Sequence, residues 1–262
     1  NLWTKAAHGE PPRVLEYANE TEEARGIIEE IKRLTGRGGF TYNDIAVFYR
    51  TNAQSRSFEE AARRARIPYR LIGSVRFYER KEIKDILSYL KLLVNPADTV
   101  SLLRVINTPA RGIGKTAVDR IMSHSRQKEI PLYDALLCSE QVPDITNTAR
   151  RGIKEFLNLF EGVKSDLFSA TPALMLEKIL TNSGYWKMTE DLADKDPQES
   201  LARLGNLQEL VNAVKEFEER CVKQGDAPNL PKYLEEVMLA SQVDELNTDT
   251  HAITLMTVHL AK

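Results

Sequence analysis

The spacing of apolar residues changes near residue 80, and this change limits the folds open to the chain. Before it, short runs rich in β-branched and aromatic residues alternate with stretches in which apolar residues recur every three or four positions. Strands alternating with helices predict an α/β domain with a parallel sheet. The strand-like runs are residues 13–18, 44–50 and 67–73, and the helix-like stretches are residues 21–34 and 54–66. The run DIAVFYR at 44–50 is typical of a strand buried on both faces.

From residue 80 to about residue 241 nearly every segment has helical periodicity. Residues 252–258, AITLMTV, then return to β character. The simplest topology is a sheet domain that carries an all-helical insert, with the last strand rejoining the sheet. Two apolar stripes mark the helices: Ile83, Ile86, Leu87, Leu90 and Leu93, and then Leu201, Leu204, Leu207, Leu210, Val211, Val214 and Phe217.

The predicted fold class is therefore α/β, a partial parallel sheet with a large all-helical inserted subdomain. We expect residues 1–95 to form the first part of the sheet domain, residues 96–250 the insert, and residues 251–262 the return strand. The sequence starts without methionine and stops as a β-like run ends, which suggests a piece of a longer protein.

Composition narrows the class of protein. The chain has 262 residues, 42% of them apolar, which suits one large domain or two smaller ones. It has neither a membrane-length apolar run nor a secretory signal, so we expect a cytoplasmic protein. Cys138 and Cys221 lie far apart and are expected to be free thiols. The four histidines lack metal-ligand spacing with them, so no metal site is predicted.

Charge is unevenly distributed along the chain. Residues 50–91 contain 11 Lys and Arg against 5 Asp and Glu, whereas residues 184–250 contain 7 against 15. A basic region in the first third fits a polyanion site, and it fits an unevenly charged solvated surface equally well.

The stretch NTPARGIGKTAV at residues 107–118 ends like a nucleotide-binding P-loop. A P-loop requires a glycine five residues before Gly114, because its long loop wraps phosphates with backbone amides. That position holds Pro109, which has no amide proton. The preceding SLLRVIN also has helical rather than strand spacing. The stretch is therefore not a P-loop.

The same glycines have the form of a helix–hairpin–helix. Gly112 and Gly114 flank Ile113, and a new helix is expected to begin near Lys115 or Thr116. Such a hairpin exposes amides at a helix N-terminus, where a phosphate can bind, and Arg111 and Lys115 add positive charge. The alternative is a tight turn between helices that binds nothing.

Other candidate residues lie at predicted strand ends, where ligands of open α/β sheets bind. Tyr49 could stack on a base and Arg50 could reach a phosphate, although on spacing alone a core tyrosine and a locally paired arginine are favoured. Thr257 and His259 could contact phosphates after the last strand, although a lone histidine is more often structural. The segment GSVRFYERKEIKD at 73–85 suits single-stranded nucleic acid. The alternative, favoured on the residues alone, is an amphipathic helix with Phe77 in the core and its charges in water.

The order of YRTNAQSR, RFYERKEIKD, NTPARGIGKTAV, SGYW and ITLMTVHLAK resembles the C-terminal half of superfamily-one DNA helicases of the UvrD, PcrA and Rep type. The resemblance implies a partial second RecA-like motor domain with its helical insert. It implies that Tyr49 stacks on adenine and that Arg50 contacts the γ-phosphate as the catalytic residue, like an arginine finger. Gln54 belongs to the same nucleotide-binding motif.

The resemblance also implies contacts with DNA. Residues Arg111, Gly112, Ile113, Gly114, Lys115 and Thr116 would hold duplex backbone ahead of a fork, and Thr257 and His259 would contact the single strand. The full-length protein would use ATP with Mg²⁺ to move 3′ to 5′ in repair or replication, near the nucleoid. Its partners would be DNA, the N-terminal motor domain and repair proteins, without a membrane. This chain lacks the P-loop and the magnesium-binding motif, so alone it would be inactive.

Three alternatives remain open at this stage. The chain could be a helical module that binds DNA or a partner without any motor role. It could belong to a helicase-like subunit of a nuclease complex. It could also be a structural scaffold in which the YR and GIG elements only pack.

Overall fold

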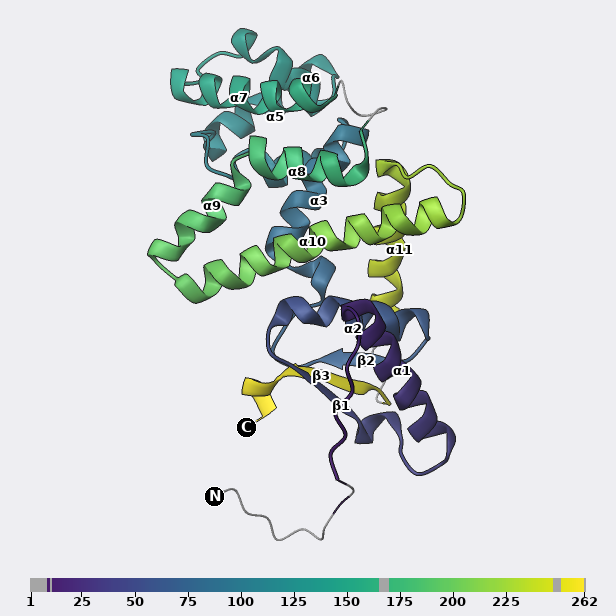
Figure 1. Cartoon of the computed structure of the whole chain (residues 1–262). Helices are drawn as coiled ribbons and strands as arrows, with labels where there is room; N and C mark the ends of the chain where they lie inside the picture. Colours follow the sequence, from purple (N-terminus) through teal and green to yellow (C-terminus); the bar gives the residue numbers. More distant parts are fainter. Residues whose placement is uncertain (1–8, 10, 165–169, 247–250, 262) are drawn as a thin grey trace.

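The computed structural model describes residue 9 and residues 11–164, 170–246 and 251–261, the side chains of residues 241–246 excepted. Figure 1 shows two parts, a small sheet with its helices near both chain termini and a larger body of helices. α3 rises from the first part into the second, and α10 runs across the side of the helical body that is nearest the sheet.

The sheet has three parallel strands in the order β1-β3-β2. Their bounds are Ala46–Tyr49 for β1, Tyr69–Leu71 for β2 and Ile253–Thr257 for β3. Tyr49 pairs with Thr257, and Leu71 pairs with Leu255. The strand from the end of the sequence therefore lies between the two strands from its first third, and the carboxyl ends of all three face the same edge.

Two helices cover one face of this sheet. α1 (Glu20–Gly36) starts at Asn19, whose side chain accepts the amide proton of Glu22, and α2 (Ser55–Arg64) follows β1 directly. Both helices are amphipathic. Side chains of alternate strand residues point to the same face of the sheet, and the apolar stripes of the two helices pack on that face. The resulting core contains Ala24, Ile28, Ile31, Val47, Tyr49, Phe58, Ala62, Ile67, Tyr69, Ile253 and Leu255.

Two of the predicted strands need correction. Residues 13–18 form no strand, and Val14 and Leu15 are exposed, because no described strand pairs with this segment. β1 is not buried on both faces, because α1 and α2 cover only the face of Val47 and Tyr49, and the alternate residue Phe48 is 51% exposed.

The remaining helices form one larger body. Its main cluster of buried side chains runs from Phe77 to Val237 and includes the whole predicted stripe from Ile83 to Leu93. The buried side chains of residues 77–93, which the sequence division placed with the sheet, pack in this cluster. The helices are α3 (Lys81–Val94), α4 (Thr99–Val105), α5 (Lys115–Lys128), α6 (Leu132–Leu137), α7 (Asn147–Lys164), α8 (Pro172–Asn182), α9 (Tyr185–Asp191), α10 (Pro197–Lys223) and α11 (Leu230–Leu246).

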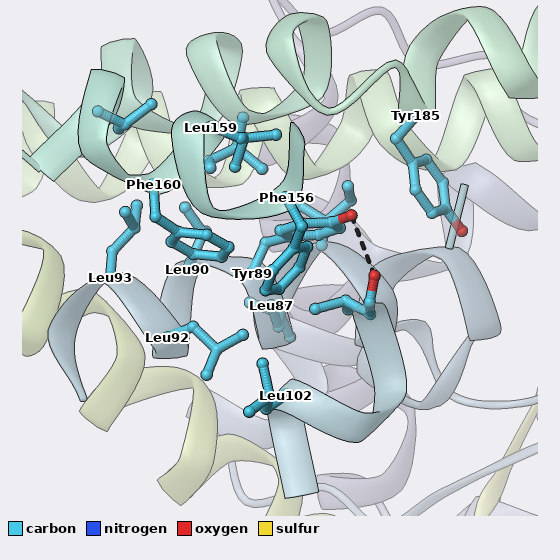
Figure 2. Close-up of a cluster of buried hydrophobic side chains, with 14 of the residues drawn as sticks. Leu87, Tyr89, Leu90, Leu92, Leu93, Leu102, Phe156, Leu159, Phe160 and Tyr185 are labelled. Carbon is cyan, nitrogen blue, oxygen red and sulfur yellow. Dashed lines mark hydrogen bonds between the residues drawn. The ribbon is translucent and has the colours of Figure 1, made fainter. Parts of the chain in front are cut away.

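Aromatic packing marks the centre of this body (Figure 2). Tyr89 of α3 lies against Phe156 and Phe160 of α7, with ring centroids 6.4 and 6.1 Å apart. The two phenylalanine rings meet edge to face at 5.0 Å, a favourable arrangement of their quadrupoles. In α10, the predicted stripe is buried from Leu207 onward, whereas Leu201 near the start of the helix is exposed.

α10 joins the two parts through a buried ion cluster. The guanidinium of Arg56 in α2 is 2% exposed and contacts three carboxylates, those of Glu209, Glu216 and Glu60, at 2.5, 3.1 and 2.9 Å. Burial acts to lower the pKa of Arg56, but the hydrogen bond to Glu216 and the three negative charges outweigh it. Burial likewise acts to raise the pKa of Glu216, and Arg56 holds that pKa below its ordinary value. For Glu209 the balance is reversed, because burial raises its pKa even beside Arg56, so the single cation compensates the three carboxylates only in part.

Replacing Arg56 with methionine should destabilise the chain by about 3–5 kcal/mol at neutral pH, because it leaves buried carboxylates without their cation. The penalty should shrink at lower pH. Because the pKa of Glu216 is lowered in the native chain, its ionised carboxylate stabilises the fold at pH values above 4.5, the ordinary pKa of glutamate. This contribution is lost as the pH falls through the lowered pKa. Urea unfolding at pH 7.5 and pH 4.5 measures both effects.

The matched control is Arg64→Met. Arg64 binds the same Glu60 but its side chain is 52% exposed, so the loss should be about 0–1 kcal/mol. Equal losses of unfolding free energy for the two variants, or a penalty for Arg56→Met that grows toward low pH, would show that Arg56 does not stabilise buried carboxylates.

Candidate nucleic-acid interface

Arg50 lies at the carboxyl end of β1 and is exposed. Its backbone amide and that of Thr51 both donate to Oε1 of Gln54, each at 3.0 Å. The backbone amide of Gln54 donates in turn to the Thr51 carbonyl at 3.2 Å. These bonds close residues 50–54, which we call the strand-end loop, around the short η2 turn (Asn52–Gln54). The oxygen of Gln54, expected to help bind a nucleotide, is thus used to shape the loop that presents Arg50.

Tyr49 is not available for stacking on adenine. Its side chain is 5% exposed, and its ring is stacked on Phe58 of α2 with centroids 6.3 Å apart. Burial, and then the charge of Glu59, raises the pKa of Tyr49 to about 12. The expected stacking of Tyr49 on adenine therefore needs correction. Alternation along β1 turns Tyr49 toward the core beside Val47, whereas the next residue, Arg50, faces solvent.

The end of β3 lies beside the end of β1. Thr257, partly exposed, pairs with Tyr49, and the exposed His259 lies in the following η6 turn (Val258–Ala261). Gly73, after β2, has a φ of 68°, and a Cβ there would lie 2.4 Å from Cδ1 of Leu260. The segments that follow all three strands therefore meet at one edge, and this edge carries Arg50, Thr257 and His259.

The hairpin after α4 forms as the sequence predicts, with α5 beginning at Lys115. Gly112 needs to be glycine, because its φ is 74° and a Cβ would lie 2.7 Å from Cγ2 of Thr148. Gly114, Lys115 and Thr116 are exposed, and no side chain caps the first turn of α5. This is the arrangement that leaves helix N-terminal amides open to a phosphate.

Ile113, one of the predicted hairpin contacts, lies inside the protein. Ile113 is 2% exposed, and its amide donates to Oδ1 of Asn107 at 3.2 Å, so neither its side chain nor its amide is open to DNA. Asn107 also accepts the Arg111 amide at 2.7 Å. Sequence reasoning missed this role, although asparagine is a frequent turn residue because its side chain bonds nearby backbone.

Arg111 is the clearest correction. Its Nη1 donates to the carbonyls of Val105, Ile106 and Pro109, and its Nη2 donates to the Tyr89 hydroxyl and the Ser183 carbonyl, at 2.7 to 3.4 Å. The guanidinium carbon also lies 5.6 Å from the centroid of Phe156. Positive charge beside the C-terminal carbonyls of α4 and α8 is favourable. Arg111 therefore stabilises the base of the hairpin rather than facing a phosphate.

In the segment 73–85, Phe77 lies in the core at 1% exposure, as the helical alternative predicts, but its charges are not all in water, since Arg80 is only 4% exposed. Arg80 donates to Asn206 of α10 at 2.6 Å and to the carbonyl of Asn52 at 2.9 Å. Arg56, Arg80 and Asn206 were not among the predicted functional residues. The one local indication was the spacing of four between Arg56 and Glu60, which places both on one helix face.

Two further features bear on the kind of site. Within the parts of the chain that the structure describes, no group of three or more histidine, cysteine or acidic residues could hold a metal ion. None of the described helices is long and apolar enough to cross a membrane.

The sequence is similar to known proteins over its whole length. A family model described as the UvrD-like helicase C-terminal domain matches residues 1–262. The chain is 43% identical over 276 residues to the ATP-dependent DNA helicase UvrD1 of Mycobacterium tuberculosis strain H37Rv. It is 36% identical over 265 residues to the ATP-dependent DNA helicase PcrA of Staphylococcus aureus strain NCTC 8325. All of this chain is covered in both comparisons, but it spans only 35% of the length of either relative.

Arg111 and Lys115 should differ sharply in their effect on stability. Arg111→Met removes the donors of several carbonyls and should cost at least about 2 kcal/mol in the free energy of unfolding. Lys115→Ala changes an exposed side chain and should stay within about 0.5 kcal/mol. Urea unfolding of both variants tests this; a destabilising Lys115→Ala beside a neutral Arg111→Met would show that the two roles are reversed.

Proposed function

The chain belongs to the UvrD-like helicase C-terminal domain family, and we propose that it is the second motor domain, with its helical insert, of an ATP-dependent 3′–5′ DNA helicase. In this proposal the sheet edge contacts single-stranded DNA or nucleotide, and the hairpin contacts duplex DNA at a fork. The helicase would act in repair or replication, with repair proteins among its partners.

One observation carries the proposal: Arg50, Thr257 and His259 come from distant parts of the sequence and lie at the same carboxyl edge of a parallel sheet. This edge is where ligands of open α/β sheets bind. Donor groups of this kind suit phosphate, since a guanidinium presents paired donors and a threonine hydroxyl can also donate.

Two phosphates are candidates for Arg50, the γ-phosphate of ATP and a phosphate of the single strand. The first follows from the family resemblance and would make Arg50 a catalytic residue in the cleft between two motor domains. The second is favoured by the surroundings. Tyr49 is buried and offers no adenine stack, and the neighbouring strand end carries Thr257 and His259, for which the family resemblance implies contacts with the single strand. We therefore propose the DNA phosphate as the primary contact of Arg50.

The hairpin supplies a second, separate contact. Gly114, Lys115 and Thr116 present an uncapped helix N-terminus with an adjacent positive charge, which can bind the duplex backbone without reading sequence. Gly112 and Arg111 act on this contact indirectly, by setting the shape of the hairpin.

ATP chemistry requires groups that this chain does not contain. Its sequence has no P-loop, since Pro109 occupies the place of the first glycine of the one similar stretch. We propose that the N-terminal motor domain binds ATP and Mg²⁺, whose charge would stabilise the transferring phosphoryl group. The contribution of this chain is then to hold DNA at Arg50 and at the hairpin while the partner domain turns over the nucleotide.

Arg50→Ala tests the primary contact. The affinity of the chain for a labelled oligo-dT single strand should fall about tenfold, the effect of losing one charge-assisted hydrogen bond. The slope of log K against log salt concentration should fall by about 0.7, one phosphate's worth. Fluorescence anisotropy over a salt series measures both, and ATP turnover by the chain alone should stay at background.

Arg37→Ala is the matched control, since Arg37 is also exposed but lies after α1, ahead of β1 at the opposite edge of the sheet. It should leave DNA binding unchanged. If Arg50→Ala also leaves single-strand binding unchanged, the DNA assignment fails and the γ-phosphate becomes the remaining candidate.

Gly114→Val tests the hairpin contact. Gly114 has a φ of −75° and open space around its Cβ position, so valine should fold normally while covering the α5 amides. Duplex affinity should fall about tenfold, whereas single-strand affinity should not change. Gly162→Val, another position with room for a side chain, is the control. A loss of single-strand but not duplex binding would contradict the division of contacts.

A further inference from the structure

Arg80 occupies an unusual position for a buried cation. Its guanidinium is 4% exposed, and the nearest carboxylate oxygen for which an ion pair is recorded, that of Glu59, is 3.9 Å away. Its short hydrogen bonds go instead to neutral acceptors: Oδ1 of Asn206 at 2.6 Å, Oγ of Ser55 at 2.7 Å and the Asn52 carbonyl at 2.9 Å. A side chain placed only to balance charge would be expected to lie closer to its carboxylate.

The acceptors of Arg80 come from two different parts of the molecule. Asn52 lies in the strand-end loop and Ser55 begins α2, whereas Asn206 lies in α10. Asn206 uses both ends of its amide, since it accepts from Arg80 and donates to Glu82. α10 also touches the loop directly: a Cβ on Gly205 would lie 3.6 Å from Cβ of Ala53. The helical part therefore rests on the loop that presents Arg50.

The other bonds of this loop lie within it or at the start of α2. The side chain of Gln54 holds the amides of Arg50 and Thr51, and the Asn52 carbonyl accepts from the Ser55 amide as well as from Arg80. If α10 moved away, Arg80 would lose Asn206, and the remaining bonds to Asn52 and Ser55 would have to hold a buried guanidinium without it. Such partly satisfied buried groups are costly, so the loop would rearrange.

We propose that Arg80 is a positioning residue that ties the strand-end loop to α10, so that Arg50 takes its phosphate-binding position only while α10 is docked on the sheet part. The bridge runs from Asn206 through Arg80 to the Asn52 carbonyl. The proposal rests on the proposed function in one respect, namely that Arg50 contacts phosphate. Affinity at the sheet edge then depends on where the helical part lies.

The position of the loop can be measured without any ligand. Asn206→Ala removes the α10 end of the bridge, and Arg80→Lys keeps the charge but cannot span both acceptors. Hydrogen exchange at the amides of Arg50 and Thr51, followed by NMR in the whole chain, should become about tenfold faster in both variants. Ser200→Ala is the matched control, because it removes a buried hydroxyl of α10 that bonds the Thr189 carbonyl, away from the loop.

Unchanged exchange at Arg50 and Thr51 in both folded variants would overturn the proposal, as would equal acceleration in Ser200→Ala. Urea midpoints identify variants that are folded. Because Arg80→Lys retains a cation for Glu59 and Glu82, it keeps the test usable should Asn206→Ala unfold.

Binding of an oligo-dT single strand provides the second readout. If Asn206→Ala displaces Arg50, it should lower the salt slope as Arg50→Ala does, and the double variant should be no weaker than Arg50→Ala alone. A merely destabilised protein would lose binding-competent molecules but keep its slope, and additive losses would overturn the bridge. If Arg50→Ala itself has no effect on DNA, the proposed DNA contact fails, and hydrogen exchange still decides whether Arg80 positions the loop.

Discussion

Removing two guanidinium groups from water is the constraint on which the arrangement of this chain depends. Arg56 lies in α2 of the sheet part and Arg80 lies at the start of α3, and both are almost fully buried. A buried cation is tolerated only where acceptors surround it, and α10 supplies Glu209 and Glu216 to one and Asn206 to the other. The helical part is therefore needed to satisfy the sheet part, and the loop carrying Arg50 lies at their junction.

This junction changes the meaning of the charge distribution. The excess of Lys and Arg in residues 50–91 suggested either a polyanion site or a solvated surface, and the acidic excess in residues 184–250 had no assigned purpose. In the structure, basic residues from the first region pair with acidic residues from the second. Part of the charge that would suggest nucleic-acid binding is thus neutralised inside the molecule, and the exposed Arg50 gains importance as a candidate contact.

Sequence periodicity predicted most of the helices and three strands because those patterns are local. It failed at residues 13–18, where β-like composition has no described strand to pair with, and at the open face of β1, where no described helix covers Phe48. Site prediction failed for a related reason. Tyr49 and Arg111 have side chains suited to nucleotide and phosphate, but Tyr49 packs on Phe58, and Arg111 bonds the carbonyls of its own hairpin and of Ser183. Whether such a side chain turns inward depends on how the elements pack together, which residue spacing does not show, whereas Gly112 and Gly114 were recognisable because turn geometry is local.

If the sheet edge and the hairpin are two separate surfaces for nucleic acid, a single strand and a blunt duplex should protect different amides of the intact chain from hydrogen exchange. We expect the single strand to protect residues 50–54 and 257–261, and the duplex to protect residues 112–118. Protection of neither segment by either DNA, or the same footprint for both, would contradict this expectation.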